Sequence, residues 1–282
     1  MGAGSIRVML GKIDQKQISY QEIHRIENKI VESEGRERWE MDRIIREIKL
    51  GITKAIQNAK HVPESVGVDS WGVDFVLLDD QGDLLETPVA YRDRGTEGMQ
   101  DQWNSVLSVM ESFSRPGLCF YIFNTLFQLL SMMDSEVIRK TAGILFIPSY
   151  VNFLLTGNPR NELTISSTSQ LLDVEGDQWD IEILDKLNLD KKLFGEVVWP
   201  GTLLGPVIIP EARGTGMEGI AVCGHDTACV VAAIPVENPN YAFISAGTWC
   251  IVGMESRAPL ISEEALNLGL TNERGYNNTY RT

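Results

Sequence analysis

The sequence is poor in positive charge and in histidine, and it has no long apolar run. In 282 residues, 25 Lys and Arg stand against 39 Asp and Glu, giving a formal net charge of -14. Such a chain repels nucleic-acid backbones and anionic membranes, so we expect neither as a partner. No stretch approaches the roughly 18 apolar residues of a membrane-spanning helix, and the first residues lack a signal-peptide pattern. These absences predict a cytoplasmic protein with a small-molecule partner.

The chain has only four cysteines, Cys119, Cys223, Cys229 and Cys250. None belongs to a CxxC pair or to a Cys/His cluster with metal-ligand spacing, so the sequence predicts no metal site of that kind. All four lie among apolar residues, where a reduced thiol behaves as a small hydrophobic group. We therefore expect four buried, free thiols.

Hydrophobic periodicity predicts an α/β fold with a mixed sheet flanked by helices. Residues 5–40 alternate like three antiparallel strands in a meander, and residues 41–60 carry the apolar stripe of one long helix. A buried strand over 65–79 is expected to pair with 84–93. Further helices are predicted at 98–113, 124–141 and 148–157, and further strands at 143–147, 219–224 and 241–255.

The stretch "GHDTACVVAAI" places Asp226 after an apolar strand and at the start of an apolar helix. The partial positive charge at a helix N-terminus keeps a carboxylate ionised and able to accept a proton. Asp is also a common helix cap, so the pattern leaves two roles open, a cap and a general base. His225 is the only histidine in such a turn, but no Ser or Cys nucleophile accompanies it, and we predict no triad.

Two turns of small residues each join strands. In "SAGTWC", Gly247 and Thr248 leave backbone amides and a hydroxyl open to an anion such as phosphate, although ligand-free turns of this kind are common. The N-terminal "MGAGSIRVML" contains a similar turn at Ala3, Gly4 and Ser5. No P-loop motif occurs. Two such turns and one carboxylate at a helix start suggest nucleotide phosphates held between two hairpins, as in the actin and sugar-kinase fold.

The tripeptide Gly-Val-Asp occurs twice in "GVDSWGVDF". Strand alternation predicts Asp69, Trp71 and Val73 on one face and Ser70, Gly72 and Asp74 on the other. The two aspartates therefore do not form a catalytic pair. Gly72 leaves room for a sugar against the strand, Trp71 supplies an apolar wall, and Asp69 and Asp74 serve as polar anchors for hydroxyls or neighbouring amides.

Six stretches match a known family in order along the chain: "GVDSWGVDFVLLDDQG", "PVAYRDRGTEGM", "FNTLFQLL", "LTGNPRNELTISSTSQLLDV", "GHDTACVVAAIP" and "YAFISAGTWCIVGMES". On these motifs the chain resembles the FGGY carbohydrate kinases, and most closely the branch that acts on L-rhamnulose. The resemblance implies ribonuclease-H-like (actin-like ATPase) architecture, with a sugar-binding domain over 1–234 and the beginning of an ATP-binding domain over 235–282. It also implies ATP and Mg²⁺ as cofactors and phosphorylation of L-rhamnulose at O1.

Residue by residue, the resemblance makes Asp226 the general base. It makes Gly72, His225, Asp226 and Thr227 sugar-binding positions. It assigns the nucleotide phosphates to Thr248 and to a hairpin formed by Ala3, Gly4, Ser5 and Arg7.

Departures from the family pattern qualify this expectation. Met1 stands inside the first phosphate loop, so the family's preceding strand and its magnesium-binding Asp are expected to be missing, as is most of the ATP lobe after Thr282. Ile6 replaces a usual Gly and Ser149 a usual Asp. We expect the isolated chain to be impaired as a kinase. The alternatives are a kinase for another ketose, such as L-fuculose or D-ribulose, and a catalytically silent sugar-binding protein.

Overall fold

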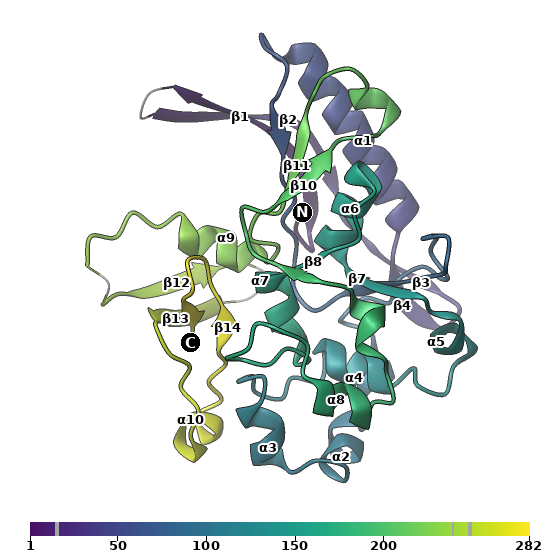
Figure 1. Cartoon of the computed structure of the whole chain (residues 1–282), viewed down its shortest axis with the longest axis vertical. Helices are drawn as coiled ribbons and strands as arrows, with labels where there is room; N and C mark the ends of the chain where they lie inside the picture. The colour runs from purple at the N-terminus through teal and green to yellow at the C-terminus, as the bar shows by residue number, and fades with distance from the viewer. Residues whose placement is uncertain (15–16, 239, 248–249) are drawn as a thin grey trace.

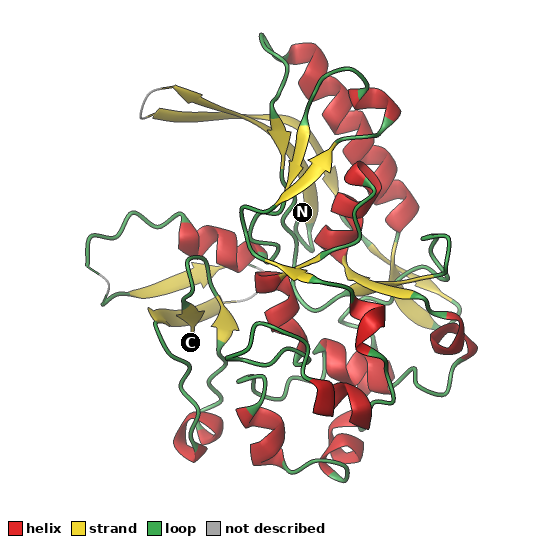
Figure 2. Cartoon of the chain, viewed as in Figure 1, coloured by secondary structure: helices red, strands yellow, loops and turns green. Residues whose placement is uncertain are grey.

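The computed structural model describes residues 1–14, 17–238, 240–247 and 250–282. Short strands in several small sheets alternate with helices along the chain (Figure 1; Figure 2). The long helix α1 lies at one end of the molecule, most of the short helices lie at the other, and the C-terminal strands gather to one side. The expected α/β class with mixed strand directions is confirmed.

The N-terminal residues form two separate hairpins. Strands β1 (Ser5–Asp14) and β2 (Gln17–Glu27) are antiparallel, and their distal ends project from the body (Figure 1). Strands β3 (Ile30–Ser33) and β4 (Arg36–Trp39) form the second pair. The expected three-stranded meander is wrong, because Glu34 and Gly35 both have positive φ, 55° and 74°. Two such residues make a tight hairpin turn that divides the expected third strand.

Helix α1 (Met41–Asn58) confirms the predicted amphipathic helix. Its buried face includes Ile44, Ile48 and Ile52 and packs on the β1–β2 hairpin. Gly51 lies on the same face, where an added Cβ would stand 2.4 Å from Cγ2 of Val8. A glycine is therefore required for the helix to approach the strand this closely.

The expected buried strand over 65–79 is divided into β5 (Ser65–Val66) and β6 (Phe75–Leu78). Strand β6 pairs with β7 (Gly143–Phe146) and touches the expected partner only at a single bridge, Leu78 to Leu84. Its side chains alternate between two cores. Val76 and Leu78 pack in one with α1, and Phe75 and Leu77 pack in the other with the short helices. A strand covered on both faces is nearly continuous in apolar residues, which explains its sequence.

Two of the long helices expected from periodicity are each divided. Ser108 and Ser135 accept hydrogen bonds from Glu111 and Ile138 as N-caps, so a new helix begins after each serine. The expected helix at 148–157 is confirmed as α6 (Ile147–Thr156), ending at Gly157 with φ 76°.

None of the helices in the described ranges is long and apolar enough to cross a membrane. The remaining helices of this region are α2 (Met99–Asn104), α3 (Val109–Ser114), α4 (Thr125–Leu130), α5 (Glu136–Lys140), α7 (Leu163–Ser166) and α8 (Ile181–Lys186), with 3₁₀ turns η1 (Arg94–Thr96), η2 (Ser167–Ser169), η3 (Lys191–Phe194) and η4 (Pro210–Ala212).

The remaining strands form three small sheets. Strand β8 (Asn161–Glu162) is parallel to β9 (Val197–Val198). Strand β11 (Glu218–Ile220) lies between β10 (Leu203–Pro206) and β5. After α9 (Asp226–Ala232), the C-terminal sheet has the order β12-β13-β15-β14. Its elements, with one helix, are β12 (Ala242–Ala246), β13 (Cys250–Ser256), α10 (Glu263–Asn267), β14 (Glu273–Arg274) and β15 (Tyr280–Arg281).

The four cysteines differ in exposure, although all are free thiols. Cys119 and Cys223 are buried and Cys229 is partly buried. The expectation of burial is wrong for Cys250, which is exposed at the start of β13. The apolar residues around Cys250 in the sequence therefore do not indicate that its strand is buried.

Candidate active site

A backbone contact joins the two motifs that carry the candidate site residues. The amide of Ser70 donates to the carbonyl of Gly224 at 2.8 Å, and the amide of Asp226 donates to the carbonyl of Ser70 at 2.8 Å. This parallel bridge holds the segment before β6 beside the start of α9. Residues separated by about 150 positions in the sequence, Gly72 and Asp226 among them, thereby come together.

Asp226 is the first residue of α9, and His225 occupies the cap position. The Asp226 side chain is 45% exposed, and its Oδ1 accepts the Thr227 amide at 2.7 Å. The same oxygen lies 3.4 Å from Nε2 of His225. The cap role left open by the sequence is therefore wrong, because the helix begins one residue earlier than a capping Asp226 requires. Asp226 satisfies the adjacent Thr227 N–H and still presents carboxylate surface to solvent, which is compatible with a general base. Thr227 itself is buried.

Gly72 lies beside Nε2 of His225. An added Cβ at Gly72 would stand 3.4 Å from Nε2 of His225 and 3.5 Å from Oγ1 of Thr168. A larger side chain here would occupy the space in front of the imidazole. The partly buried glycine therefore leaves the space beside Nε2 of His225 without a side chain of its own.

The predicted strand alternation is wrong around Gly72, because Val73 has φ 65° and turns the chain. The Val73 amide donates to Oγ1 of Thr168 at 3.1 Å, and its carbonyl accepts from Oγ1 of Thr125 at 2.6 Å. These bonds fix a conformation that a β-branched residue rarely adopts. As a result, Trp71 and Asp74 lie on the same side, with a 2.8 Å hydrogen bond between Nε1 and Oδ2.

Asp74 lies in the core with no exposed surface, and Trp71 is 5% exposed. Asp74 accepts from Trp39, Trp71, Gln128 and the Tyr91 amide. Burial raises the pKa of Asp74 to about 6, against the opposing effect of these four donors. The structure thus makes Asp74 an anchor for neighbouring N–H groups and buries Trp71 beside it.

Two carboxylates that sequence reasoning did not find support the junction. Buried Glu162 accepts the Gly224 amide at 2.7 Å and caps α7 through the Ile165 amide at 3.1 Å. Burial raises its pKa, and hydrogen bonds from Thr164, Gly224 and Ile165 oppose that shift. The second carboxylate is Glu273, whose Oε2 lies 3.0 Å from Nδ1 of His225. Neither residue lies in a recognisable spacing, because both reach the junction only through the tertiary fold.

Comparison with known proteins identifies the class to which this site belongs. Residues 1–234 match the N-terminal domain of the FGGY family of carbohydrate kinases. The chain belongs to the FGGY carbohydrate kinase family. It is 36% identical over 285 aligned residues to a curated rhamnulokinase from Oceanobacillus iheyensis, covering all of this chain and 60% of that protein. The chain thus spans about three fifths of the length of this relative.

Solved structures of FGGY kinases share the fold. A xylulose kinase from Lactobacillus acidophilus superimposes with a TM-score of 0.85 at 17% identity, covering 99% of this chain and 57% of the other. Plasmodium falciparum glycerol kinase with ADP gives a TM-score of 0.82 at 16% identity, with 99% and 58% covered. The expected actin-like ATPase architecture is therefore confirmed for the part of the fold that this chain contains.

The first phosphate-loop candidate of this FGGY chain lies beside the junction. The terminal ammonium of Met1 donates to the Asp69 carbonyl at 2.6 Å and to its Oδ1 at 3.0 Å, one residue before Ser70. Gly4 is exposed, with open space where a Cβ would stand, and its carbonyl accepts the Asn28 amide at 3.2 Å. The loop is thus anchored at Asp69 and Asn28 while its glycine remains accessible. Its other candidates are partly buried Ala3 and Ser5 and exposed Arg7.

The second candidate loop is described only in part. Gly247 is exposed after β12, and Thr248 lies outside the described residues. Within the described ranges, no three His, Cys, Asp or Glu side chains come together as a metal site. Mg²⁺ in kinases commonly binds through one or two carboxylates together with substrate phosphates. The described residues thus form no magnesium cage of their own.

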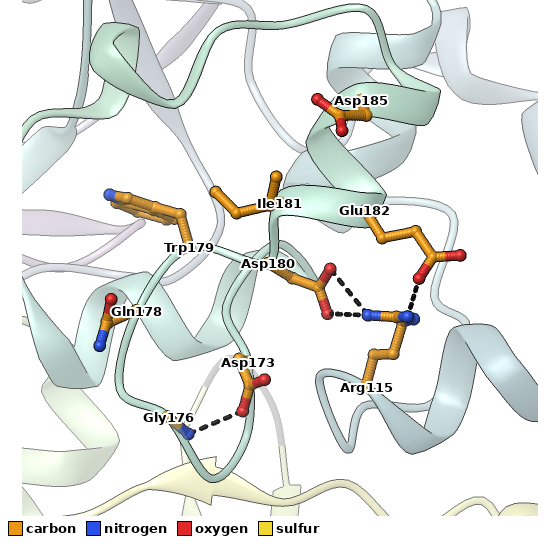
Figure 3. A pocket seen from close by; sticks show the side chains of 9 residues that line it. All are labelled: Arg115, Asp173, Gly176, Gln178, Trp179, Asp180, Ile181, Glu182 and Asp185. Atoms are coloured by element: carbon orange, nitrogen blue, oxygen red, sulfur yellow. Dashed lines mark hydrogen bonds and ion pairs between the residues drawn. The ribbon is translucent and has the colours of Figure 1, made fainter.

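A separate hollow of about 520 Å³ lies by α3 and α8 (Figure 3). Arg115 points into it and pairs with Asp180 at 2.9 Å and with Glu182. Asp180 is also the N-cap of α8. Three charged groups of this hollow, Arg115, Asp180 and Glu182, are therefore engaged with one another, and no residue of the Asp226 junction lines it.

Proposed function

We propose that the protein containing this chain is an ATP-dependent kinase that phosphorylates L-rhamnulose at O1, with Asp226 as general base. The observation that carries the proposal is the juxtaposition of Gly72 with a partly exposed carboxylate at the start of α9. Membership of the FGGY family and 36% identity to a curated rhamnulokinase support the reaction and the substrate. Residues 1–234 would form the sugar-binding domain, and 235–282 would begin the ATP-binding domain.

In the proposed reaction, O1 of the ketose attacks the γ-phosphoryl group of ATP. Asp226 accepts the O1 proton as the new O–P bond forms and the bond to ADP breaks. A sugar hydroxyl is a weak acid, so proton transfer is late and positioning contributes most of the rate. His225, Thr227 and the space over Gly72 would orient the ketose, while Ala3–Arg7, Gly247 and Thr248 would contact the nucleotide. Mg²⁺ bound with ATP would neutralise phosphate charge.

The decisive experiment compares ketoses and one substitution. L-Rhamnulose, L-fuculose and D-ribulose are offered to the full-length protein with coupled detection of ADP, and to the 282-residue chain in calorimetry. We expect L-rhamnulose to give the highest turnover. Asp226→Asn keeps the oxygen that accepts the Thr227 amide, so it should retain ketose binding and lose about 10²- to 10⁴-fold in turnover.

The matched control is Asp190→Asn, since Asp190 caps a surface 3₁₀ turn through the Lys192 amide and lies outside the junction. It should leave turnover unchanged. Preference for another ketose would reject L-rhamnulose as substrate, and full turnover by Asp226→Asn would reject Asp226 as the base. Failure of the full-length protein to turn over any ketose would favour a catalytically silent sugar-binding protein.

A further inference from the structure

Both ring nitrogens of His225 face carboxylates. Nδ1 lies 3.0 Å from Oε2 of Glu273 and 3.4 Å from a guanidinium nitrogen of Arg281, and Nε2 lies 3.4 Å from Oδ1 of Asp226. A neutral imidazole has one N–H, so it donates to only one of the two. Which nitrogen carries the proton therefore decides what His225 presents to the space over Gly72.

Glu273 is the better acceptor by geometry and by charge. Its contact with Nδ1 is the shorter of the two, and the pKa of Glu273 falls to about 2. Burial alone would raise this pKa, but the charge of a protonated His225, the Arg281 guanidinium and the hydrogen bond from His225 outweigh it; with a neutral ring, Arg281 and the hydrogen bond still favour the ionised carboxylate. An ionised carboxylate only accepts hydrogen bonds, so the 3.0 Å contact requires a proton on Nδ1. The Arg281 nitrogen lies farther from Nδ1, at 3.4 Å, and has nearer acceptors in Glu273 and the Arg274 carbonyl.

Hydrogen bonds hold both the Glu273 side chain and the strand that carries it. Arg281, its partner across the β14–β15 pair, donates from a guanidinium nitrogen to Oε2 at 2.8 Å and to the Arg274 carbonyl at 3.1 Å. The Arg274 amide in turn donates to Oγ of Ser167 in η2 at 2.9 Å. The C-terminal sheet therefore holds the Glu273 carboxylate in a fixed position beside His225.

We propose that Glu273 is a positioning residue, which holds the His225 ring in the Nδ1–H form and directs Nε2 toward a ketose hydroxyl over Gly72. This inference rests on the proposed ketose kinase. In the neutral ring, Nε2 is an acceptor and leaves Asp226 free of a hydrogen bond from its neighbour. The site for the sugar is then completed by a residue of 235–282, beyond the segment that contains every other sugar contact predicted here.

The test reads the tautomer directly. The chain is labelled with ¹⁵N-histidine, and two-bond ¹H–¹⁵N correlations show which nitrogen of His225 is protonated, with His225→Asn identifying its signals among three histidines. We expect a protonated Nδ1 in the unchanged chain and in Glu273→Gln, whose amide oxygen still accepts. In Glu273→Ala the proton should move to Nε2, and calorimetric affinity for L-rhamnulose should fall by up to about tenfold, as for the loss of one hydrogen bond to a neutral acceptor.

Glu255→Ala is the matched control, because Glu255 accepts the Thr279 hydroxyl at 2.8 Å in the same sheet and is not bonded to His225. It should change neither the tautomer nor the affinity. An unprotonated Nδ1 in the unchanged chain would overturn the inference even if Glu273→Ala failed to fold. An equal loss of affinity in Glu255→Ala would also overturn it. The tautomer is read without substrate, so it stands or falls separately from the proposed reaction.

Discussion

The indole nitrogen of Trp39 donates to Oδ2 of Asp74 at 2.6 Å, across 35 residues of sequence. The same oxygen accepts from Trp71, whose ring centroid lies 4.4 Å from that of Trp39. One buried carboxylate thus pins two tryptophans and, through Gln128, the helix α4. The segment that carries Gly72 lies directly beside this anchor, so its conformation depends on Asp74.

Replacing Asp74 should therefore destabilise the fold. Asp74→Ala leaves two indole N–H groups and the Tyr91 amide without their acceptor, and we expect a loss of roughly 2 to 4 kcal/mol in the free energy of unfolding. Asp74→Asn keeps one acceptor oxygen and should lose about 1 kcal/mol. Denaturant titration followed by tryptophan fluorescence measures both. The exposed Asp80→Ala is the control, and an equal effect there would refute the anchor.

Asp74 also predicts a pH dependence with an unusual sign for a carboxylate. Its pKa is about 6 in the folded state against an ordinary value of 3.8, so the folded state binds the proton more tightly. Its contribution to stability is therefore fully present below about pH 4 and is lost as pH rises through 6, by about 3 kcal/mol.

This dependence is measured as the difference in unfolding free energy between the unchanged chain and Asp74→Asn. As pH rises from 4 to 6.5, the unfolding free energy of the unchanged chain should fall relative to that of Asp74→Asn. Taking the difference removes other groups such as Glu273, whose pKa is lowered and whose contribution is lost instead at acidic pH. A flat difference across this range would show that Asp74 titrates normally.

Local patterns predicted α1, α6 and β7 from the sequence because each depends on its own apolar spacing. They failed where a few residues change the chain direction. Glu34 and Gly35 with positive φ divided a strand, and the caps at Ser108 and Ser135 divided helices. Such turns and caps depend on bonds that an apolar period does not record.

In the candidate site, too, features that depend on neighbouring residues were predicted from the sequence, and features that depend on distant contacts were not. The helix start at Asp226 was visible in the sequence, whereas the contact between Ser70 and Gly224, which brings its motif to the Gly-Val-Asp motif, is a tertiary feature. Val73 in a left-handed conformation was not visible, because its bonds come from Thr168 and Thr125 about 95 and 52 residues away. For the same reason no pattern could reveal that Glu162 and Glu273 support the junction.

The space over Gly72 gives a third prediction. Gly72→Ala adds a Cβ at ordinary contact distance, 3.4 Å from Nε2 of His225, and should be tolerated. Gly72→Val extends into the ligand space and should weaken L-rhamnulose binding at least about tenfold while changing unfolding free energy by less than about 1 kcal/mol. Calorimetry and thermal unfolding measure the two. Gly11→Val, in open space on β1, should affect neither, and unchanged ketose binding by Gly72→Val would place the sugar elsewhere.

The last prediction concerns Glu162, which fixes the strand end that precedes His225. Its Oε2 accepts from the Gly224 amide and from Oγ1 of Thr164, and its Oε1 has no hydrogen-bond partner among the described residues. Burial raises the pKa of Glu162, so keeping this carboxylate ionised costs free energy. A neutral side chain of the same shape should therefore be accepted.

We expect Glu162→Gln to stay within about 1 kcal/mol of the unchanged chain, because its amide oxygen still accepts the Gly224 amide. Glu162→Ala leaves that amide and the first turn of α7 without an acceptor, and should lose roughly 2 to 4 kcal/mol. Hydrogen exchange at the Gly224 amide separates this cause from general destabilisation, since its protection should fall further than that of amides within α1. Equal protection of Gly224 in both variants would mean that Glu162 does not hold the junction.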